Sequence, residues 1–425
     1  MTDPRLADYC ASIDYGYTAS AREEPSGPRF LRITDIVAGP PQWDLVPFCE
    51  AAERTVERFK LEHADVVVAR TGATTGVSAF IKDPPPAVFA SYLVRLKIDE
   101  RVADPRFVSY YMRGPQFWDY MRGVLGDKSA QPNASAKTIT QAPASFPEVT
   151  DQRAIAGVLG ALDDKVEQNR RTALALARLA RAIFRAWFVD FEPVKAKAAG
   201  AAAFPSMPQE VFDALPTHFV DSEIGHVPEG WEVKAIAKIA TFLNGLALQK
   251  YPPRGDGQDL RVIKIAQLRK GSTDGADWAN GAVPAQYVIR DRDLLFSWSG
   301  TLEAEFWFGG PGALNQHLFK VTSERYPSWF CLLWIRQHLP WFRAIAASKA
   351  TTMGHIKRGH LQEAQVVVPP VPVLQAADGL LGTMYDLHAA LMIESRRLGA
   401  MRDLLLPYLV SGKVRVRTNG ANDDG

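Results

Sequence analysis

Few residues of this 425-residue chain have the types and spacing that chemistry would need. The glycine-rich run from Arg70 to Gly76 lacks the Gly-Lys-Ser/Thr ending of a phosphate-binding loop. His355 and His360 are five positions apart and lack the glutamate of a zinc-protease helix. The three cysteines form no Cys-x-x-Cys pair, and the chain carries no Asn-Pro-Pro-Tyr or glycine-rich methyltransferase signature. We therefore expect no catalytic residue, no metal site and no cofactor pocket.

Two other segments, residues 126–137 and 348–358, combine amide, hydroxyl and basic side chains with few large apolar ones. Such composition predicts exposed loops. Gln131, Asn133 and His355 could hydrogen-bond the edges of bases. The basic side chains suit phosphates, namely Lys128, Lys137, Lys349, Lys357 and Arg358. A solvated loop whose charges serve only solubility is the open alternative for each of them.

Composition is that of an ordinary globular protein, with 47% apolar and 23% charged residues and a net charge of +2. Any nucleic-acid contact must therefore come from locally concentrated basic residues. The N-terminus lacks an apolar run after a basic start, and no stretch reaches the roughly 18 apolar residues of a membrane span. We expect a cytoplasmic protein with reduced cysteines and no membrane partner.

The elements that position these residues occur twice. Apolar side chains at alternating four- and three-residue steps mark a coiled-coil seam. The first series is Ile155, Leu159, Leu162, Val166, Asn169, Ala173, Leu176, Ala180, Ile183 and Trp187. The second is Leu380, Met384, Leu387, Leu391, Glu394, Leu398, Met401 and Leu405, each 225 residues after its counterpart. One series alone would fit an ordinary amphipathic helix; two in the same phase, with the polar members Asn169 and Glu394 in register, predict coiled-coil helices.

The segments ahead of these helices also correspond. Residues 65–81 and 293–308 each predict a strand, a glycine-containing turn and a second strand. Residues 89–94 correspond to 314–319, and an aromatic helix follows near Pro105 in one half and near Pro327 in the other. A short strand ending in proline, at Pro147 and Pro369, should precede each long helix. Arg70, Thr71, Thr74 and Thr75 at the first turn, and Ser299 at the second, could approach a phosphate backbone, although a plain tight turn is the alternative.

A family resemblance rests on the helical segments. Residues 162–171 and 182–191 resemble the central helical region of the specificity subunits of type I restriction–modification systems. Residues 219–233 resemble the start of their second target-recognition domain, and residues 398–416 resemble their distal helix end. The chain departs from the pattern in two places. Its first half lacks a counterpart of residues 228–233, and the basic Arg70 of the first turn becomes Trp298 in the second.

The resemblance implies an α+β fold, in which two mixed α/β target-recognition domains are separated by two long antiparallel coiled-coil helices in a pseudo-two-fold repeat. The expected domains are residues 1–149 (first target-recognition domain), 150–192 (central helix), 193–218 (linker), 219–372 (second target-recognition domain), 373–407 (distal helix, ended by Pro407) and 408–425 (tail). The implied partners are double-stranded DNA, two copies of a DNA methyltransferase subunit and a restriction/translocase subunit. S-adenosylmethionine, ATP and Mg²⁺ would belong to those partner subunits.

The helices have two expected roles. Ile155 to Trp187 spans about 48 Å as a helix, which suits a ruler that holds two half-sites about one DNA turn apart. Asn169 and Glu394 would fix the register of the pair. Arginines off the seam would contact the partner subunits, unless they form only a solvated helical face: Arg170, Arg171, Arg178, Arg181 and Arg185.

Two functions of different class follow from these observations. The first is a non-catalytic, sequence-specific DNA-binding subunit that recognises a bipartite target and positions methyltransferase and restriction subunits. The second is a coiled-coil adaptor whose two repeated domains bind proteins. Salt-sensitive and sequence-selective binding to a duplex is required only by the first.

Overall fold

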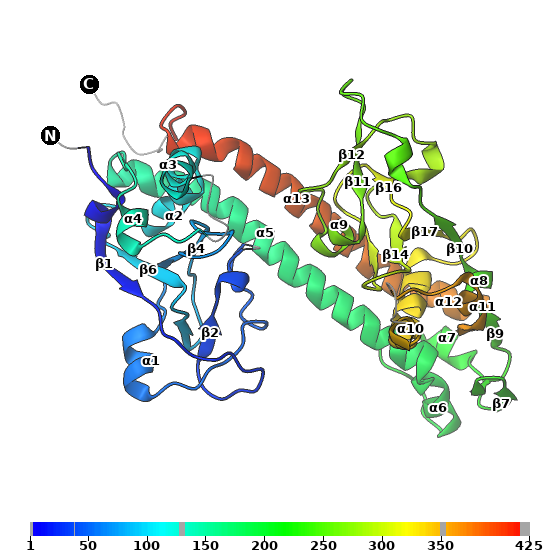
Figure 1. Cartoon of the computed structure of the whole chain (residues 1–425). Coiled ribbons are helices and arrows are strands. Elements are labelled where there is room, and N and C mark those ends of the chain that lie inside the picture. Colours follow the sequence, from blue (N-terminus) through cyan, green and yellow to red (C-terminus); the bar gives the residue numbers. More distant parts are fainter. Residues whose placement is uncertain (1–2, 38, 127–131, 349–353, 417–425) are drawn as a thin grey trace, which may run out of the picture. The chain divides into compact units, whose positions relative to one another are not determined.

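The computed structural model describes all residues except 1–2, 38, 127–131, 349–353 and 417–425. The chain divides into two compact units, unit 1 (Met1–Asp164 with Leu398–Gly425) and unit 2 (Lys165–Arg397). Each unit contains a part of both long helices (Figure 1). None of the helices in the described part of the chain is long and apolar enough to cross a membrane.

Unit 1 contains a four-stranded antiparallel sheet and a parallel strand pair. The strands are β1 (Cys10–Tyr15), β2 (Arg29–Leu31), β3 (Val66–Ala69), β4 (Ser78–Phe80), β5 (Ala87–Phe89) and β6 (Leu93–Ile98). The sheet order is β1-β6-β3-β4, and β2 pairs with β5 in parallel. Every residue of β3 is buried, which explains its unbroken run of Val and Ala.

Unit 2 repeats this topology. Its strands are β10 (Thr241–Asn244), β11 (Leu260–Ile263), β12 (Trp278–Ala279), β13 (Val288–Ile289), β14 (Leu294–Ser297), β15 (Ala304–Phe306), β16 (Gly312–Leu314) and β17 (Leu318–Thr322). The order β10-β17-β14-β15 matches that of unit 1, and β11 pairs with β16 in parallel as β2 pairs with β5. The predicted hairpins and the repeat are therefore confirmed.

One strand expectation is wrong. In unit 2, β18 (Gln365–Val368) pairs with β9 (Glu232–Ala235) before Pro369, as expected. In unit 1, residues 141–148 form no strand, and only Pro143 makes an isolated bridge, to Arg5. The same pairing exists in shorter form, because Leu6 N donates to Ala142 O at 3.0 Å and Ala144 N to Pro4 O at 2.9 Å, as Ile236 N donates to Ala364 O beside β9 and β18. In the described residues it extends over a single bridge, at Pro143, which has no N–H to donate.

Helices complete each unit. Unit 1 has α1 (Glu53–Phe59), α2 (Pro105–Arg113), α3 (Pro115–Leu125), α4 (Ala136–Thr140) and the 3-10 turns η1 (Leu6–Tyr9) and η2 (Ile33–Asp35). Unit 2 has α8 (Ile236–Ile239), α9 (Ile265–Lys270), α10 (Ser328–Ser348), α11 (Arg358–Glu363) and the turns η4 (Leu248–Lys250) and η5 (Ala285–Tyr287). The segment predicted as a linker contains α6 (Glu192–Ala198) and α7 (Gln209–Asp213), followed by the hairpin of β7 (Phe219–Ser222) and β8 (Gly225–Pro228).

The first long helix follows its predicted seam. It comprises α5 (Val149–Phe184) and a π-helical turn, η3 (Arg185–Val189). Its seam positions are buried or half-buried, as the coiled-coil prediction requires.

The distal helix comprises α12 (Val371–Ala377), a π-helical turn η6 (Asp378–Gly382) and α13 (Thr383–Val410). Here the predicted phase is wrong by about one residue. Leu387 and Met401 are 48% and 51% exposed, whereas Leu381, Tyr385 and Ala389 are buried. A π turn holds more residues than an α turn and so rotates the following positions around the helix axis.

Pro407 also does not end this helix, which continues to Val410. Leu406 and Leu409, on either side of Pro407, are buried against Phe107, Tyr110, Ile155 and Leu159. The apolar packing of the last turn outweighs the backbone hydrogen bond that proline cannot donate.

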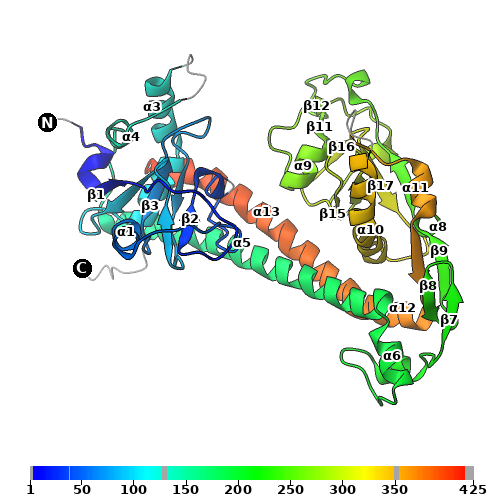
Figure 2. The same cartoon turned by 60° about the horizontal axis from the view of Figure 1, so that its bottom comes forward.

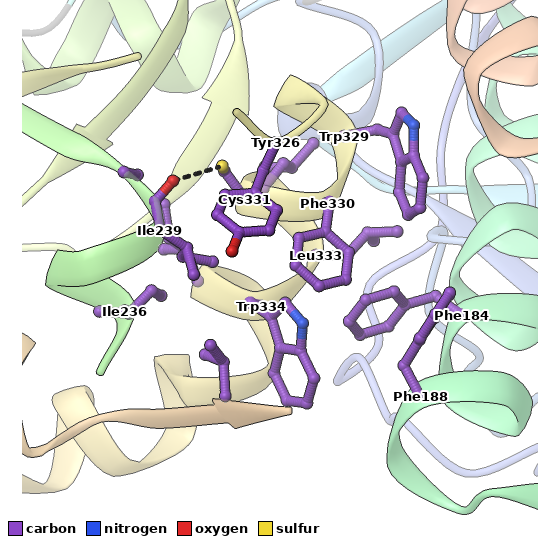
Figure 3. Close-up of a cluster of buried hydrophobic side chains, with 14 of the residues drawn as sticks. Phe184, Phe188, Ile236, Ile239, Tyr326, Trp329, Phe330, Cys331, Leu333 and Trp334 are labelled. Carbon is purple, nitrogen blue, oxygen red and sulfur yellow. Dashed lines mark hydrogen bonds between the residues drawn. The ribbon is translucent and has the colours of Figure 1, made fainter. Parts of the chain in front are cut away.

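In unit 2, the end of the first long helix packs into an aromatic core. Phe184 and Phe188 face the side chains of Phe330 and Trp334 on α10 (Figure 3). The ring centroids of Phe184 and Trp334 are 5.2 Å apart in an edge-to-face arrangement, a geometry that stabilises buried aromatic pairs. Seen from a second direction, α10 lies beside the strands of this unit (Figure 2).

Candidate nucleic-acid interface

A close backbone approach fixes the start of the candidate surface in each unit. Gly16 follows β1 and Gly245 follows β10; a Cβ atom would lie 2.2 Å from the carbonyl oxygen of Ala90 at Gly16 and 2.1 Å from that of Asn315 at Gly245. Only glycine fits such an approach. The residue before each glycine, Tyr15 or Asn244, therefore stands at the strand end beside the hairpin tip.

In unit 1, the hairpin tip is joined to the polar loop that precedes α4. Thr71 forms an antiparallel bridge with Asn133, and Gly72 N donates to the carbonyl oxygen of Pro132 at 2.9 Å. The Thr75 hydroxyl donates to the same carbonyl at 3.1 Å and to Gly72 O at 2.7 Å. Two segments about sixty residues apart in sequence thus form one continuous surface.

Unit 2 builds the same surface from different side chains. Ser299 bridges His355, and Gly300 N donates to Gly354 O at 2.9 Å. The Ser299 hydroxyl lies 2.9 Å from His317 Nδ1. Two predicted residues, Ser299 and His355, are therefore neighbours, as Thr71 and Asn133 are in unit 1.

The chemistry at the centre of the surface differs between the units. In unit 1, the Arg70 guanidinium lies 4.8 Å from the Tyr15 ring centroid, and its Nη2 is 3.5 Å from Asn133 Oδ1. In unit 2, the corresponding pair is Trp298 and Asn244, whose Oδ1 accepts a 2.8 Å hydrogen bond from the indole N–H. Unit 1 therefore presents a cation on an exposed aromatic ring, whereas unit 2 presents a neutral indole whose donor is occupied.

The short helices α4 and α11 carry further predicted basic residues. Ser135 caps α4 by accepting from Thr138 N, and Lys137 is exposed in its first turn. Lys357 is the cap residue of α11 and Arg358 its first residue, and both are exposed. Thr74 is half-buried in the hairpin turn. Three other predicted contacts lie outside the described residues: Lys128, Gln131 and Lys349.

Tyr15 and Asn244 are part of this surface but are absent from the sequence-based predictions. Each lies just before the glycine of close approach and contacts the hairpin-tip residue of its unit. The Tyr-Gly and Asn-Gly dipeptides were the available signal. Their meaning depends on the contact with Ala90 and Asn315, which sequence spacing does not reveal.

Comparisons with known proteins agree with this architecture. No family model matches the chain. The MjaIX specificity subunit of a type I restriction enzyme from Methanocaldococcus jannaschii is 24% identical over 322 residues, or 73% of this chain and 69% of that protein. The HindI specificity subunit of a type I restriction enzyme from Haemophilus influenzae is 21% identical over 355 residues, 73% of this chain and 77% of that protein. The chain is a homologue of type I restriction enzyme specificity subunits.

The fold supports the same grouping. The crystal structure of the S subunit of a type I restriction–modification system from M. genitalium superimposes with a TM-score of 0.54 at 13% identity, covering 96% of both chains. The two mixed α/β regions and the two long helices of this chain are therefore the fold of a type I specificity subunit.

In this homologue of the specificity subunits, the five predicted partner-binding arginines lie on the unit 2 part of α5 and the π turn that follows it. Glu167 pairs with Arg170 at 2.7 Å and with Arg171 at 2.6 Å, and Arg185 pairs with Asp190 at 2.9 Å. Arg178 and Arg181 are exposed.

Asn169 and Glu394 meet between the two helices of unit 2. Asn169 is 1% exposed and donates from Nδ2 to Glu394 Oε2 at 2.6 Å. Lys165 Nζ lies 3.7 Å from the same oxygen. The buried Asn169 amide finds its hydrogen-bond acceptor in Glu394, whose side chain is partly exposed. A buried amide with one available acceptor disfavours other registers, which is the physical requirement for a register-fixing contact.

Proposed function

We propose that this chain is the DNA-recognition subunit of a type I restriction–modification complex and that it reads a bipartite target with one half-site per unit. Double-stranded DNA would contact the surface formed by the hairpin tip, the polar loop and the strand end of each unit. Two copies of a methyltransferase subunit and a restriction/translocase subunit would bind the complex through the helical parts of the chain.

One observation carries the proposal. The same three-segment surface is built in both units with the same backbone hydrogen bonds, while its central side chains change from Arg70 and Tyr15 to Trp298 and Asn244. A reader of two different half-sites needs this combination, because a fixed backbone frame positions the surface and variable side chains specify the bases.

DNA methylation, DNA cleavage and ATP hydrolysis would be carried out by the partner subunits and not by this chain. The chain lacks the sequence motifs of a phosphate-binding loop or a methyltransferase, so S-adenosylmethionine, ATP and Mg²⁺ would act in the methyltransferase and restriction subunits. We expect the purified chain to show no methyltransferase, nuclease or ATPase turnover.

The decisive experiment is a domain exchange in the co-expressed complex. Replacing residues 1–145 with the equivalent segment of a relative should change one half of the methylated motif and leave the other half unchanged. The readout is the methylome of the host together with binding to a duplex at increasing salt. A chain that binds duplexes without sequence preference at every salt concentration, but still captures protein partners, would favour the adaptor function instead.

A further inference from the structure

Unit 2 contains an arginine-lined pocket that is separate from the hairpin and loop surface. Its cavity volume is about 550 Å³, and it lies among α5, β15 and α10. Its charged lining residues are Arg181, Arg185, Glu303, Glu305, Arg336 and Arg343. Four arginines and two glutamates line the pocket, and one of the arginines, Arg185, is already paired with Asp190 at 2.9 Å.

The arginines differ in what they already bind. Arg336 is engaged, since it forms an ion pair with Glu305 and donates from Nε to Ala304 O at 3.0 Å. Arg343 donates to Leu302 O at 2.9 and 3.2 Å. Arg181 makes no hydrogen bond or ion pair to any described residue. The Arg181 guanidinium is therefore available for a ligand.

The floor of the pocket is apolar. Phe184 and Leu333, seen in Figure 3, line it together with Leu339 and Pro340. A ligand that fills this pocket must bring an apolar group as well as negative charge.

Unit 1 has no arginine at the corresponding positions, although it repeats the same elements. The last turns of α13, residues 404–410, contain no arginine, whereas the corresponding turns of the first long helix carry Arg181 and Arg185. Leu406 is 5% exposed and its Cδ2 lies 3.7 Å from the Cβ position of Gly114. Side chains of the helix itself thus occupy this place in unit 1.

The two helices that cover the sheets confirm the contrast. In the sequence, aligning residues 105–125, which form α2 and α3, with α10 on Pro105 and Pro327 places Gly114 opposite Arg336 and Met121 opposite Arg343. Met121 is fully buried in the core of unit 1. Unit 1 has apolar side chains or glycine in these places and still adopts the same fold. The four arginines of unit 2 are therefore not needed for the fold.

We infer that this pocket of unit 2 binds an acidic segment of a partner protein subunit, with a carboxylate on Arg181 and an apolar side chain on the floor, once per chain. This inference rests on the proposed function. A protein is favoured over a DNA backbone because Glu303 and Glu305 would repel phosphates, whereas a peptide can place a donor beside them. A single site per chain also means that partners bound to the two repeats make unequal contacts.

The test uses the tagged full chain co-expressed with the methyltransferase and restriction subunits of its own system. Arg181→Glu reverses the free charge, and Arg181→Leu removes it while keeping an extended apolar side chain. Arg290→Glu is the matched control, because Arg290 is an exposed arginine of unit 2 that neither lines the pocket nor belongs to the predicted partner-binding arginines. We expect both Arg181 variants to weaken the affinity for one partner subunit at least tenfold and Arg290→Glu to change it less than threefold.

The outcomes separate the inference from the proposed function. If the unchanged chain captures no partner, the proposed function fails and this inference with it. If the unchanged chain assembles normally and the Arg181 and Arg290 variants behave alike, only the pocket inference is overturned. If Arg181→Glu leaves assembly intact but lowers the affinity of the free chain for a duplex, the pocket binds phosphate and the protein ligand is wrong. Circular dichroism melting of each variant controls for folding.

Discussion

Asn169 and Glu394, which are 225 residues apart, are joined by a 2.6 Å hydrogen bond from Asn169 Nδ2 to Glu394 Oε2. This separation equals the length of the internal repeat, so the contact joins corresponding positions of the two helices. In an antiparallel pair of repeated helices, equivalent residues lie opposite one another only where the pseudo-two-fold axis crosses the pair. The polar pair marks that point within unit 2.

We expect the double variant Asn169→Leu/Glu394→Leu to keep or raise the free energy of unfolding, because apolar seam residues pack at least as well as a polar pair. The same variant should lose register specificity and form dimers through exchanged helices. Urea unfolding and light scattering after gel filtration measure the two effects. A strictly monomeric and less stable protein would show that the pair does not fix the register.

In unit 1, Asp163 should be the most sensitive charge of the helix pair. It accepts hydrogen bonds from Arg402 Nη1 at 2.5 Å, Tyr110 Oη at 2.7 Å and Arg113 Nη1 at 3.1 Å. Burial alone would raise its pKa, but the charges of Arg113 and Arg402 and the hydrogen bonds lower it. Asp163→Asn should cost about 2–3 kcal/mol of stability, since it leaves the half-buried Arg113 guanidinium without an anion and leaves Arg402 paired only with the exposed Asp403.

The neighbouring Asp164→Asn is the control for this variant. Asp164 is 42% exposed and pairs with Arg106 and Lys82 near the solvent, so its loss should cost about 1 kcal/mol or less. Chemical unfolding at neutral pH compares the two variants. Equal losses would contradict the importance of burial at Asp163.

His388 predicts a pH dependence of the stability of unit 2. It contacts the rings of Phe308 and Tyr385, and burial, aided by the charge of Arg336, lowers its pKa from 6.5 to about 4. The unfolded chain binds a proton below pH 6.5, whereas the folded chain does so only near pH 4. Stability should therefore fall as the pH decreases from 6.5 to 4, by roughly 3 kcal/mol in total from this residue.

His388→Leu should abolish that contribution, leaving a shallower pH dependence between 6.5 and 4. The measurement is the urea midpoint of both proteins at pH 7.5, 6, 5 and 4.5. Parallel curves for the two proteins would show that His388 is protonated equally in the folded and unfolded chains.

The Arg70 and Trp298 positions predict unequal electrostatics at the two half-sites. Arg70→Gln should weaken binding of the first half-site by about 1–3 kcal/mol and reduce the salt slope by about one charge. Trp298→Phe should change the affinity for the second half-site but leave the salt dependence of binding unchanged. Fluorescence anisotropy on duplexes from 50 to 200 mM salt distinguishes the two results, and equal slopes for all three proteins would refute a charge contact at Arg70.

Sequence alone determined the elements whose formation depends on local pattern. The four- and three-residue steps from Ile155 onward specify a coiled-coil helix, because the helix period relates those positions wherever the helix packs. The hairpins around Gly72 and Gly300 followed from strand runs interrupted by turn residues. The correspondence of Asn169 with Glu394 also required only counting along the chain.

Tertiary structure alone decided which distant segments meet. The contacts of Thr71 with Asn133, of Arg70 with Tyr15 and of Ser299 with His355 depend on strand order and loop closure. The position of the distal seam depended on the π turn at Asp378–Gly382, which apolar spacing does not encode. The pocket beside Arg181 exists because helix packing left this place open in unit 2, whereas the end of the distal helix in unit 1 is packed with Leu406 and Leu409 buried. Periodicity fixes the face that an element buries, but the side chains that approach from other elements determine what that face contacts.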